Sequence, residues 1–179
     1  PILKGKSMEA LKSVIRDVPD FPKEGIIFKD IAPLLSDPLL FKTVIDILRN
    51  RYKDKKIDQV VGVEARGFVF ASALAYALGS GLVMVRKPGK LPYKTYQTTY
   101  SLEYGEDSIE IHQDAFKNGQ RVIIIDDVLA TGGTLSACID LVRINFQVDL
   151  VEVAFLIELD FLSGHKKLGD VPLYSMMNF

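Results

Sequence analysis

Two adjacent carboxylates and a glycine-containing turn stand close together in one stretch of the chain. Residues 122–125 are an apolar run, Asp126 and Asp127 follow it, and small residues and threonines fill positions 130–134. Backbone N–H groups can converge on an oxyanion where side chains are small, and hydroxyls and a helix N-terminus strengthen such a cradle. Adjacent carboxylates can accept hydrogen bonds from vicinal sugar hydroxyls. The stretch therefore predicts a site for a ribose 5-phosphate.

Other nucleotide-binding and hydrolytic motifs are missing from the sequence. The lysine-containing P-loop pattern does not occur, and the glycines at 79–81 lack the third glycine of a dinucleotide fingerprint. The serine-hydrolase elbow and the zinc-protease His-Glu-x-x-His pattern are absent as well. Taken as pattern alone, the 126–134 stretch is also compatible with a structural turn and helix cap.

Positive charge is concentrated in one part of the chain. Residues 65–102 contain five basic side chains and no acid, whereas residues 103–114 contain five acids and no lysine or arginine. The basic side chains are Arg66, Arg86, Lys87, Lys90 and Lys94. A solvated basic face is the plain alternative. Because three of the five follow predicted strand ends, we favour an anion pocket.

Composition excludes several classes of function. The chain has 179 residues, which predicts one domain. Its 22 Lys+Arg and 23 Asp+Glu give a net charge of −1, so no overall field attracts nucleic acid or an anionic membrane. The single cysteine, Cys138, rules out an intramolecular disulfide, and with two histidines it cannot form a Cys/His zinc cage. We expect a cytoplasmic protein that binds neither nucleic acid nor membrane.

Strands and helices alternate along the predicted fold. Short runs rich in β-branched residues predict buried strands, and apolar residues at helical spacing predict helices between them. The predicted strands are 60–63, 82–85, 122–125 and 151–157, and the predicted helices are 41–52, 67–78 and 133–143. This order implies an α/β fold with a largely parallel sheet, whose ligand lies beyond the carboxyl ends of the strands. Residues 87–104, by contrast, indicate a long loop or a twisted hairpin at the rim.

The run from 124 to 134 closely resembles the 5-phosphoribosyl 1-pyrophosphate (PRPP) signature of type I phosphoribosyltransferases. Four further segments, at 20–31, 62–68, 85–92 and 100–105, resemble the adenine phosphoribosyltransferase branch of that family. The resemblance implies a type I phosphoribosyltransferase fold over residues 1–179, a largely parallel twisted sheet flanked by helices. It also implies an N-terminal hood over about 1–35 and a flexible catalytic lid over about 87–105.

The same resemblance implies the reaction. A cytoplasmic, homodimeric enzyme of purine salvage would convert adenine and PRPP to AMP and pyrophosphate with Mg²⁺. Magnesium keeps several waters and would be bound mainly through pyrophosphate and ribose oxygens, so we assign it no protein ligand.

Roles for the phosphate and sugar groups also follow from the resemblance. Asp126 and Asp127 would hold the ribose hydroxyls. The 5-phosphate would be bound by Ala130, Thr131, Gly132, Gly133 and Thr134. Arg66 would reach the pyrophosphate after a Glu64-Ala65 peptide bond that is often cis in the family. Arg86, Lys87 and Lys90 would be further pyrophosphate contacts, one of them reaching the neighbouring subunit's site.

The base and the proton transfer are assigned in the same way. Phe28 would stack on adenine with Val128 on the other face, and backbone groups of Ile27 and Lys29 would read the amino edge. A carboxylate near N7 can accept the proton that adenine loses as N9 attacks, and Glu103 is the expected acid–base residue. Tyr104, beside it, would close over the substrates and keep water from an oxocarbenium-like state.

Two rival interpretations remain open at this point. A phosphoribosyltransferase for hypoxanthine, guanine or orotate would share the PRPP site, although Phe28 and the Glu103-Tyr104 pair argue against it. A PRPP-sensing regulator would bind the ligand without turnover, and would need a nucleic-acid-binding extension or a basic face.

Overall fold

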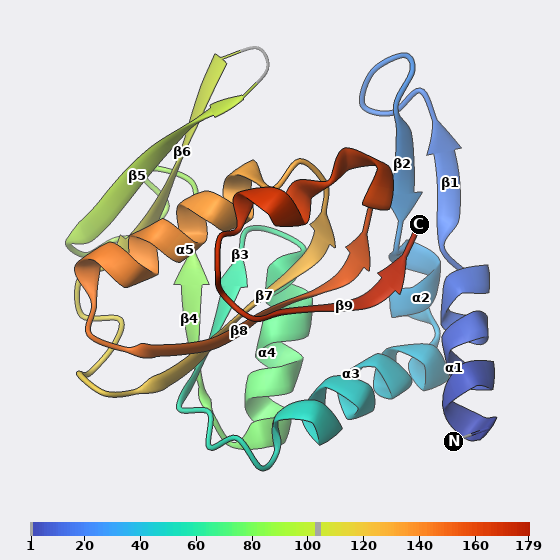
Figure 1. Ribbon diagram of the computed structural model, residues 1–179, viewed down its shortest axis with the longest axis horizontal. Coiled ribbons are helices and arrows are strands. Elements are labelled where there is room, and N and C mark those ends of the chain that lie inside the picture. Colours follow the sequence, from blue (N-terminus) through green and yellow to red (C-terminus); the bar gives the residue numbers. More distant parts are fainter. Residues whose placement is uncertain (1, 103–104) are drawn as a thin grey trace. The chain divides into compact units, whose positions relative to one another are not determined.

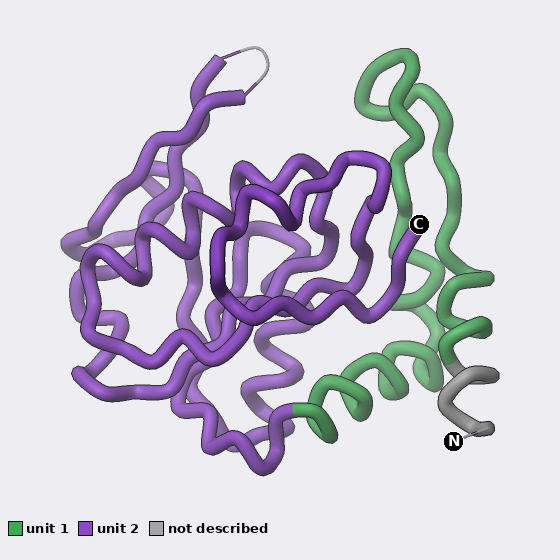
Figure 2. The backbone as a smooth tube through the Cα atoms, viewed as in Figure 1, with its two compact units in different colours: residues 1–51 green, residues 52–179 purple. Residues whose placement is uncertain are grey.

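The chain divides into two compact units, residues 1–51 and residues 52–179, which Figure 2 colours separately. The computed structural model describes residues 2–102 and 105–179, and the side chains from residue 8 onward within them. Glu103 and Tyr104, with the roles predicted for them, lie outside the described residues. The single domain over 1–179, with its hood and lid, stays a prediction beside this division.

The first unit contains helices and one antiparallel hairpin (Figure 1). Its elements are α1 (Ile2–Ser13), β1 (Arg16–Pro19), β2 (Ile27–Asp30), α2 (Ala32–Ser36) and α3 (Pro38–Tyr52), the last residue of which belongs to the second unit. Helix α3 begins three residues before the predicted start at residue 41. The Asp37 carboxylate accepts hydrogen bonds from the N–H groups of Leu39 and Leu40, at 2.9 and 3.0 Å, and so satisfies two free donors of the first turn.

A five-stranded sheet forms the centre of the second unit. Its order is β4-β3-β7-β8-β9, and every neighbouring pair is parallel. The strands are β3 (Gln59–Val63), β4 (Gly81–Val85), β7 (Arg121–Leu129), β8 (Asp149–Glu158) and β9 (Leu173–Asn178). Runs of valine and isoleucine suit such a sheet because both of its faces are covered. The predicted parallel α/β sheet is therefore confirmed.

Two helices cover the two faces of this sheet. Helix α4 (Gly67–Leu78) follows β3, and α5 (Gly133–Asn145) follows β7. In Figure 1, α5 lies in front of the sheet and α4 behind it. Side chains alternate along a strand, so Val61 and Val63 join the core beneath α5, whereas Gly62 faces α4, where a Cβ would lie 2.8 Å from the Cβ of Ala71.

The sequence prediction was wrong at the end of β7. The strand was expected to stop at residue 125, but it continues through Asp126 and Asp127 to Leu129. Pairing with β8 continues over these residues, with Asp126 opposite Phe155 and Leu129 opposite Glu158. The two carboxylates are therefore consecutive strand residues that point to opposite faces, and not the first residues of a loop.

A second hairpin begins within the predicted rim segment. Strands β5 (Thr95–Leu102) and β6 (Gly105–His112) pair in antiparallel register. The alternative of a hairpin is confirmed in kind but was wrong in its bounds, because the first strand begins at residue 95 and the second begins at residue 105, beyond the predicted segment. Two short 3₁₀ helices, η1 (Asp160–Leu162) and η2 (Gly164–Lys167), connect β8 to β9.

Candidate active site

The carboxyl ends of β3 and β7 open into a pocket of about 220 Å³. The pocket is lined by Glu64, Ala65, Arg66, Asp126, Asp127, Val128, Leu129, Ala130, Thr131, Gly132, Gly133, Thr134 and Leu135. Parallel strands place their carboxyl ends at one edge of a sheet, and this is where α/β folds bind their ligands. The structure thus brings the predicted phosphate loop, the carboxylate pair, Arg66 and Val128 into one concave site.

The loop at 130–134 has a backbone that requires glycine at position 132. Gly132 has φ +84° and is the N-cap of α5, whose first residue is Gly133. A Cβ on Gly132 would lie 2.4 Å from the carbonyl oxygen of Gly164. Both the left-handed φ and this close approach exclude a larger side chain. The N-terminus of α5 therefore faces a loop of small residues, as an anion cradle requires.

The two carboxylates differ in their partners. The Oδ1 of Asp126 accepts a hydrogen bond from the N–H of Asp127 at 2.8 Å. Burial, and then the neighbouring charge of Asp127, raise the pKa of Asp126 well above its ordinary value. The Oδ2 of Asp127, whose side chain is 7% exposed, lies 2.5 Å from the Nε of Arg66. Asp127 is therefore already matched by a cation, the guanidinium of Arg66.

Glu64 joins the loops that follow β3 and β4. Its Oε2 accepts a hydrogen bond from the backbone N–H of Lys87 at 2.8 Å and lies 3.4 Å from the Nε of Arg86. Partial burial alone would raise the pKa of Glu64, but these two partners outweigh it and lower the pKa. The peptide bond that follows, Glu64-Ala65, is cis, as the resemblance predicted. Sequence reasoning assigned Glu64 no role, although its place directly after a buried strand was a usable signal.

The three further basic residues lie in the loop after β4. A guanidinium N–H of Arg86 donates to the carbonyl oxygen of Lys90 at 3.3 Å, and the N–H of Lys90 donates to the carbonyl oxygen of Lys87, also at 3.3 Å. The ammonium of Lys87 forms an ion pair with Asp107 of β6. Within the described part of the chain, these side chains are not among those that line the pocket. They are close to it through Glu64, which touches both loops.

The residues predicted to bind adenine come from both compact units of the chain. Ile27, Phe28 and Lys29 belong to β2 of the first unit, whereas Val128 lines the pocket of the second. The ring of Phe28 contacts the ring of Phe21 edge to face, with 5.1 Å between centroids. Lys29 pairs with Asp17 at 2.6 Å.

Neither a metal cluster nor a membrane helix is found in the described residues. Over 2–102 and 105–179, no group of three or more His, Cys, Asp or Glu side chains is arranged to hold a metal ion. In the same ranges, no helix is both long and apolar enough to cross a bilayer.

Comparisons with known proteins identify the family. Residues 31–168 match the model of the phosphoribosyl transferase domain. An adenine phosphoribosyltransferase of Geobacter metallireducens is 58% identical over 172 residues, which cover 96% of this chain and 100% of the relative. One from Citrifermentans bemidjiense is also 58% identical over the same shares of both chains. The chain belongs to the adenine phosphoribosyltransferase family.

Solved structures of this family agree with the fold described above. The adenine phosphoribosyltransferase of Rhodothermus marinus is 48% identical and superposes with a TM-score of 0.92 over 98% of this chain and 99% of its own. That of Saccharomyces cerevisiae, complexed with an imino-altritol bisphosphate and adenine, is 43% identical with a TM-score of 0.90, over 96% and 99% of the two chains. The predicted family, fold and enzyme class are confirmed, and so is the predicted function at the level of the family, adenine phosphoribosyltransferases of purine salvage.

Proposed function

We propose that the chain transfers the 5-phosphoribosyl group of PRPP to N9 of adenine and releases AMP and pyrophosphate. The observation that supports this most directly is the pocket, because it gathers a phosphate loop at a helix N-terminus, a carboxylate pair and Arg66. A related enzyme from Trypanosoma brucei, 28% identical over 96% of this chain and 79% of its own with a TM-score of 0.87, was solved in complex with AMP, pyrophosphate and ribose-5-phosphate. AMP and pyrophosphate are the two products of the proposed reaction.

The phosphate end and the sugar are held by groups of β7 and α5 in this proposal. Backbone N–H groups of residues 130–134 bind the 5-phosphate, helped by the positive potential of the α5 N-terminus. Asp126 and Asp127 accept hydrogen bonds from the ribose hydroxyls. The raised pKa of Asp126 and the ion pair of Asp127 make the two contacts unequal, with Asp127 the stronger acceptor.

Cations stabilise the leaving group. As N9 forms its bond to C1 of the ribose, the bond from C1 to the pyrophosphate oxygen breaks, and pyrophosphate departs with the electron pair. Negative charge grows on that group in the transition state, so positive charge there increases the rate as well as the affinity. Arg66 lines the pocket and can turn from Asp127 toward this charge, while Arg86, Lys87 and Lys90 stand in the adjoining loop.

Magnesium is compatible with this site as a substrate-bound ion. Asp126 and Asp127 place two carboxylates beside the pocket, and within the described residues no group of three or more His, Cys, Asp or Glu side chains is arranged to hold a metal ion. An ion that takes most of its ligands from PRPP and water fits this donor set. When bound, it would neutralise pyrophosphate charge, in addition to the protein cations.

The base and its proton are assigned to residues named from the family resemblance. Phe28 stacks on adenine, with backbone groups of Ile27 and Lys29 at the amino edge and Val128 contributing from the pocket. The carboxylate of Glu103 accepts the proton that adenine loses, and Tyr104 helps to exclude water.

A cytoplasmic homodimer is the proposed form of the enzyme. Strand β4 is one of the two edge strands of the sheet, and its side chains Leu82 and Met84 are 41% and 43% exposed. Apolar side chains at an edge strand are suited to a second copy of the chain. Light scattering should give twice the 20.0 kDa chain mass, and Met84→Glu should shift it toward a single chain.

Base competition is the experiment that tests the reaction. AMP formation is measured with PRPP and Mg²⁺ while adenine, hypoxanthine, guanine and orotate compete. We expect AMP to dominate, and Glu103→Gln to lower kcat by about 100-fold or more, the scale of a lost acid–base group. Glu106→Gln, at an exposed acid of β6, is the control and should leave kcat unchanged. If another base is converted in preference to adenine, adenine is not the substrate. If the chain binds PRPP but converts no base, the interpretation as a PRPP-sensing regulator is favoured.

A further inference from the structure

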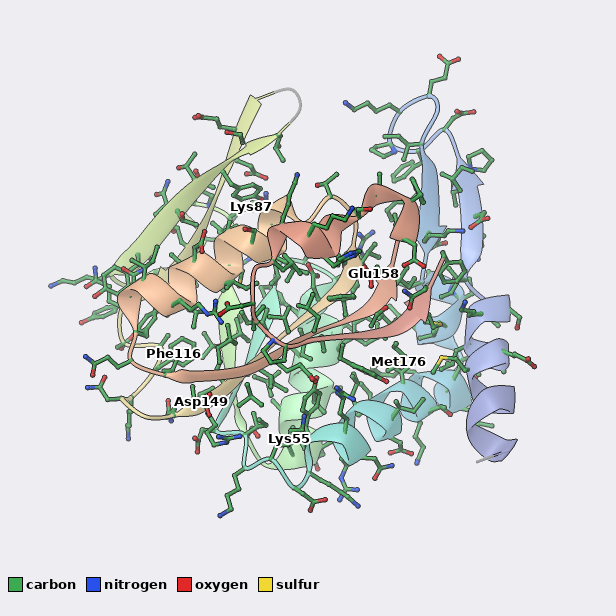
Figure 3. The ribbon with its side chains drawn as sticks, viewed as in Figure 1. Lys55, Lys87, Phe116, Asp149, Glu158 and Met176 are labelled. Carbon is green, nitrogen blue, oxygen red and sulfur yellow. The ribbon has the colours of Figure 1, made fainter. Side chains whose placement is uncertain are left out.

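A chain of polar contacts connects the β5–β6 hairpin to both anion-binding parts of the site. Tyr100 and Asp107 are direct cross-strand partners in the hairpin. The Tyr100 hydroxyl donates to Oδ2 of Asp107 at 3.2 Å, and it lies 3.1 Å from the Oγ1 of Thr134 in the phosphate loop. The same Asp107 oxygen pairs with the ammonium of Lys87, which Figure 3 labels beside the hairpin.

The hydroxyl hydrogens of Tyr100 and Thr134 can be assigned from these contacts. Partial burial alone would raise the pKa of Asp107, but the hydrogen bond and charge of Lys87 lower it, so Asp107 is a carboxylate that only accepts. The single hydroxyl hydrogen of Tyr100 therefore points to Asp107. The Tyr100 oxygen must then accept from Thr134, whose one hydroxyl hydrogen is directed away from the phosphate loop.

Lys87 is engaged in a similar way. Although partial burial would lower its pKa, the pairing with Asp107 raises it, so the ammonium is charged and its charge is balanced inside the protein. An anion that approaches Lys87 also approaches the negative charge of Asp107. Both groups expected to bind the phosphate ends of PRPP, Thr134 and Lys87, thus have an internal partner on the same hairpin.

We propose that Tyr100 and Asp107 compete with PRPP for Thr134 and Lys87 and thereby set the affinity of the site for its anionic ligands. This inference rests on the proposed function, in which Thr134 contacts the 5-phosphate and Lys87 the pyrophosphate. A phosphate monoester takes the Thr134 hydrogen from Tyr100, and pyrophosphate draws Lys87 from Asp107. Because both competitors belong to the hairpin, ligand binding also loosens its contact with the first turn of α5.

The surrounding packing makes the two residues separable in an experiment. The Tyr100 ring lies against Gly133, where a Cβ would be 3.6 Å from ring atom Cδ2, and it packs against the core of the second unit. Tyr100→Phe keeps this packing and removes only the hydroxyl. Asp107→Asn keeps the shape of the side chain and removes its charge. Either change can therefore alter binding without emptying the core.

Ligand affinities of these variants test the inference. The Kd values of AMP and of pyrophosphate with Mg²⁺ are measured by calorimetry for the full chain. Tyr100→Phe should tighten AMP binding about 3-fold, the scale of one net hydrogen bond, and leave pyrophosphate unchanged. Asp107→Asn should tighten pyrophosphate binding about 3- to 10-fold, because a like charge close to the ligand is removed. A gain in affinity is a result that damage to the fold does not produce.

The control uses another cross-strand pair of the same hairpin. The hydroxyls of Thr99 and Ser108 lie 2.8 Å apart, so Thr99→Val breaks a comparable contact without touching Thr134 or Lys87, and both Kd values should stay as in the wild type. If the folded Tyr100→Phe and Asp107→Asn variants bind these ligands no more tightly than the wild type does, the inference is overturned while the proposed function stands. A wild-type chain that binds neither AMP nor pyrophosphate would overturn the proposed function, and the inference with it.

Discussion

The Nε of Arg66 lies 2.5 Å from the Oδ2 of Asp127, within the pocket that both residues line. The two partners differ in environment, since the Arg66 side chain is 46% exposed and the Asp127 side chain 7%. Arg66 can therefore turn toward a ligand, whereas Asp127 cannot reach bulk water. A buried carboxylate without a partner is costly, so Arg66 serves both the site and the stability of its carboxylate.

Arg66→Ala should impair both functions of this arginine. We expect kcat/KM for PRPP to fall by about 100-fold or more, the scale of a lost group that stabilises transition-state charge. The Tm should fall as well, because Asp127 remains buried without its cation. Steady-state kinetics and thermal melts check the two effects. Arg66→Lys should recover part of the Tm but little of kcat/KM, because lysine keeps the charge and loses the planar geometry.

The matched control for Arg66 is Arg143→Ala on α5. Arg143 pairs with Asp170, whose side chain is 89% exposed, and such surface pairs contribute little. Its kinetics and Tm should resemble those of the wild type. An Arg66→Ala enzyme with unchanged kcat/KM would remove Arg66 from the site.

Gly164 holds the phosphate loop from the other side. A Cβ on Gly164 would lie 2.3 Å from the carbonyl oxygen of Ala130 and 3.1 Å from the nitrogen of Gly132, both of them backbone atoms of the loop. Gly164→Ala should displace the loop and raise the Kd of AMP by about 10-fold, because bound geometry tolerates shifts of only a few tenths of an ångström. Calorimetric titrations with AMP and with pyrophosphate distinguish a local displacement of the loop from general damage, since the proposed function places pyrophosphate away from this loop and its Kd should not change.

Gly81→Ala is the control for Gly164. A Cβ there would lie 2.2 Å from the Oε1 of Gln59, the far end of a flexible side chain that can move away. AMP should bind this variant as it binds the wild type. If Gly164→Ala also binds AMP normally, then η2 does not position the phosphate loop.

Sequence patterns predicted the elements whose signals are local. Helix α4 occupies residues 67–78 as predicted, because an alanine-rich run stands between Gly67 and the left-handed Gly79 that ends it. Helix α5 begins at residue 133 as predicted, because apolar residues at helical spacing follow that position. Strands β3 and β4 each begin one residue before their predicted starts, since short valine-rich runs in a parallel sheet are unambiguous.

Features that depend on distant parts of the chain could not be predicted in this way. Strand β7 continues through Asp126 and Asp127 because β8 supplies hydrogen-bond partners and Arg66 supplies a counter-charge. The role of Gly164 depends on a close approach to the phosphate loop, which no local pattern contains. Tyr100 and Asp107 meet only through the register of the hairpin.

The pKa of Glu64 leads to a pH dependence of stability. Burial alone would raise this pKa, but the Lys87 N–H and Arg86 lower it below the ordinary 4.5. A carboxyl with a lowered pKa in the folded state stabilises the protein above its ordinary pKa, and this contribution is lost as the pH falls through the folded value. The Tm of the wild type should therefore exceed that of Glu64→Gln at about pH 6, and the difference should shrink toward about pH 3.

Glu24→Gln provides the comparison for Glu64, because Glu24 is an exposed acid of the first unit. Its Tm should follow the wild-type curve over the whole range. A Tm difference for Glu64→Gln that stays constant with pH would mean that the charge of Glu64 does not stabilise the link between the two loops.

Cys138 should be chemically inert in the folded protein. Its side chain is fully buried in α5, and this burial raises the pKa of the thiol far above its ordinary value. Because the thiolate is the reactive form, a disulfide reagent at about pH 8 should label the chain in guanidinium and leave the native protein unlabelled over the same time.

Any slow native labelling must then proceed through opening of α5. If AMP binds the loop at the start of this helix, as the proposed function requires, saturating AMP should slow the labelling further, by the factor 1 + [AMP]/Kd. Fast labelling of the native chain that AMP does not affect would contradict both the burial of Cys138 and its coupling to the phosphate loop.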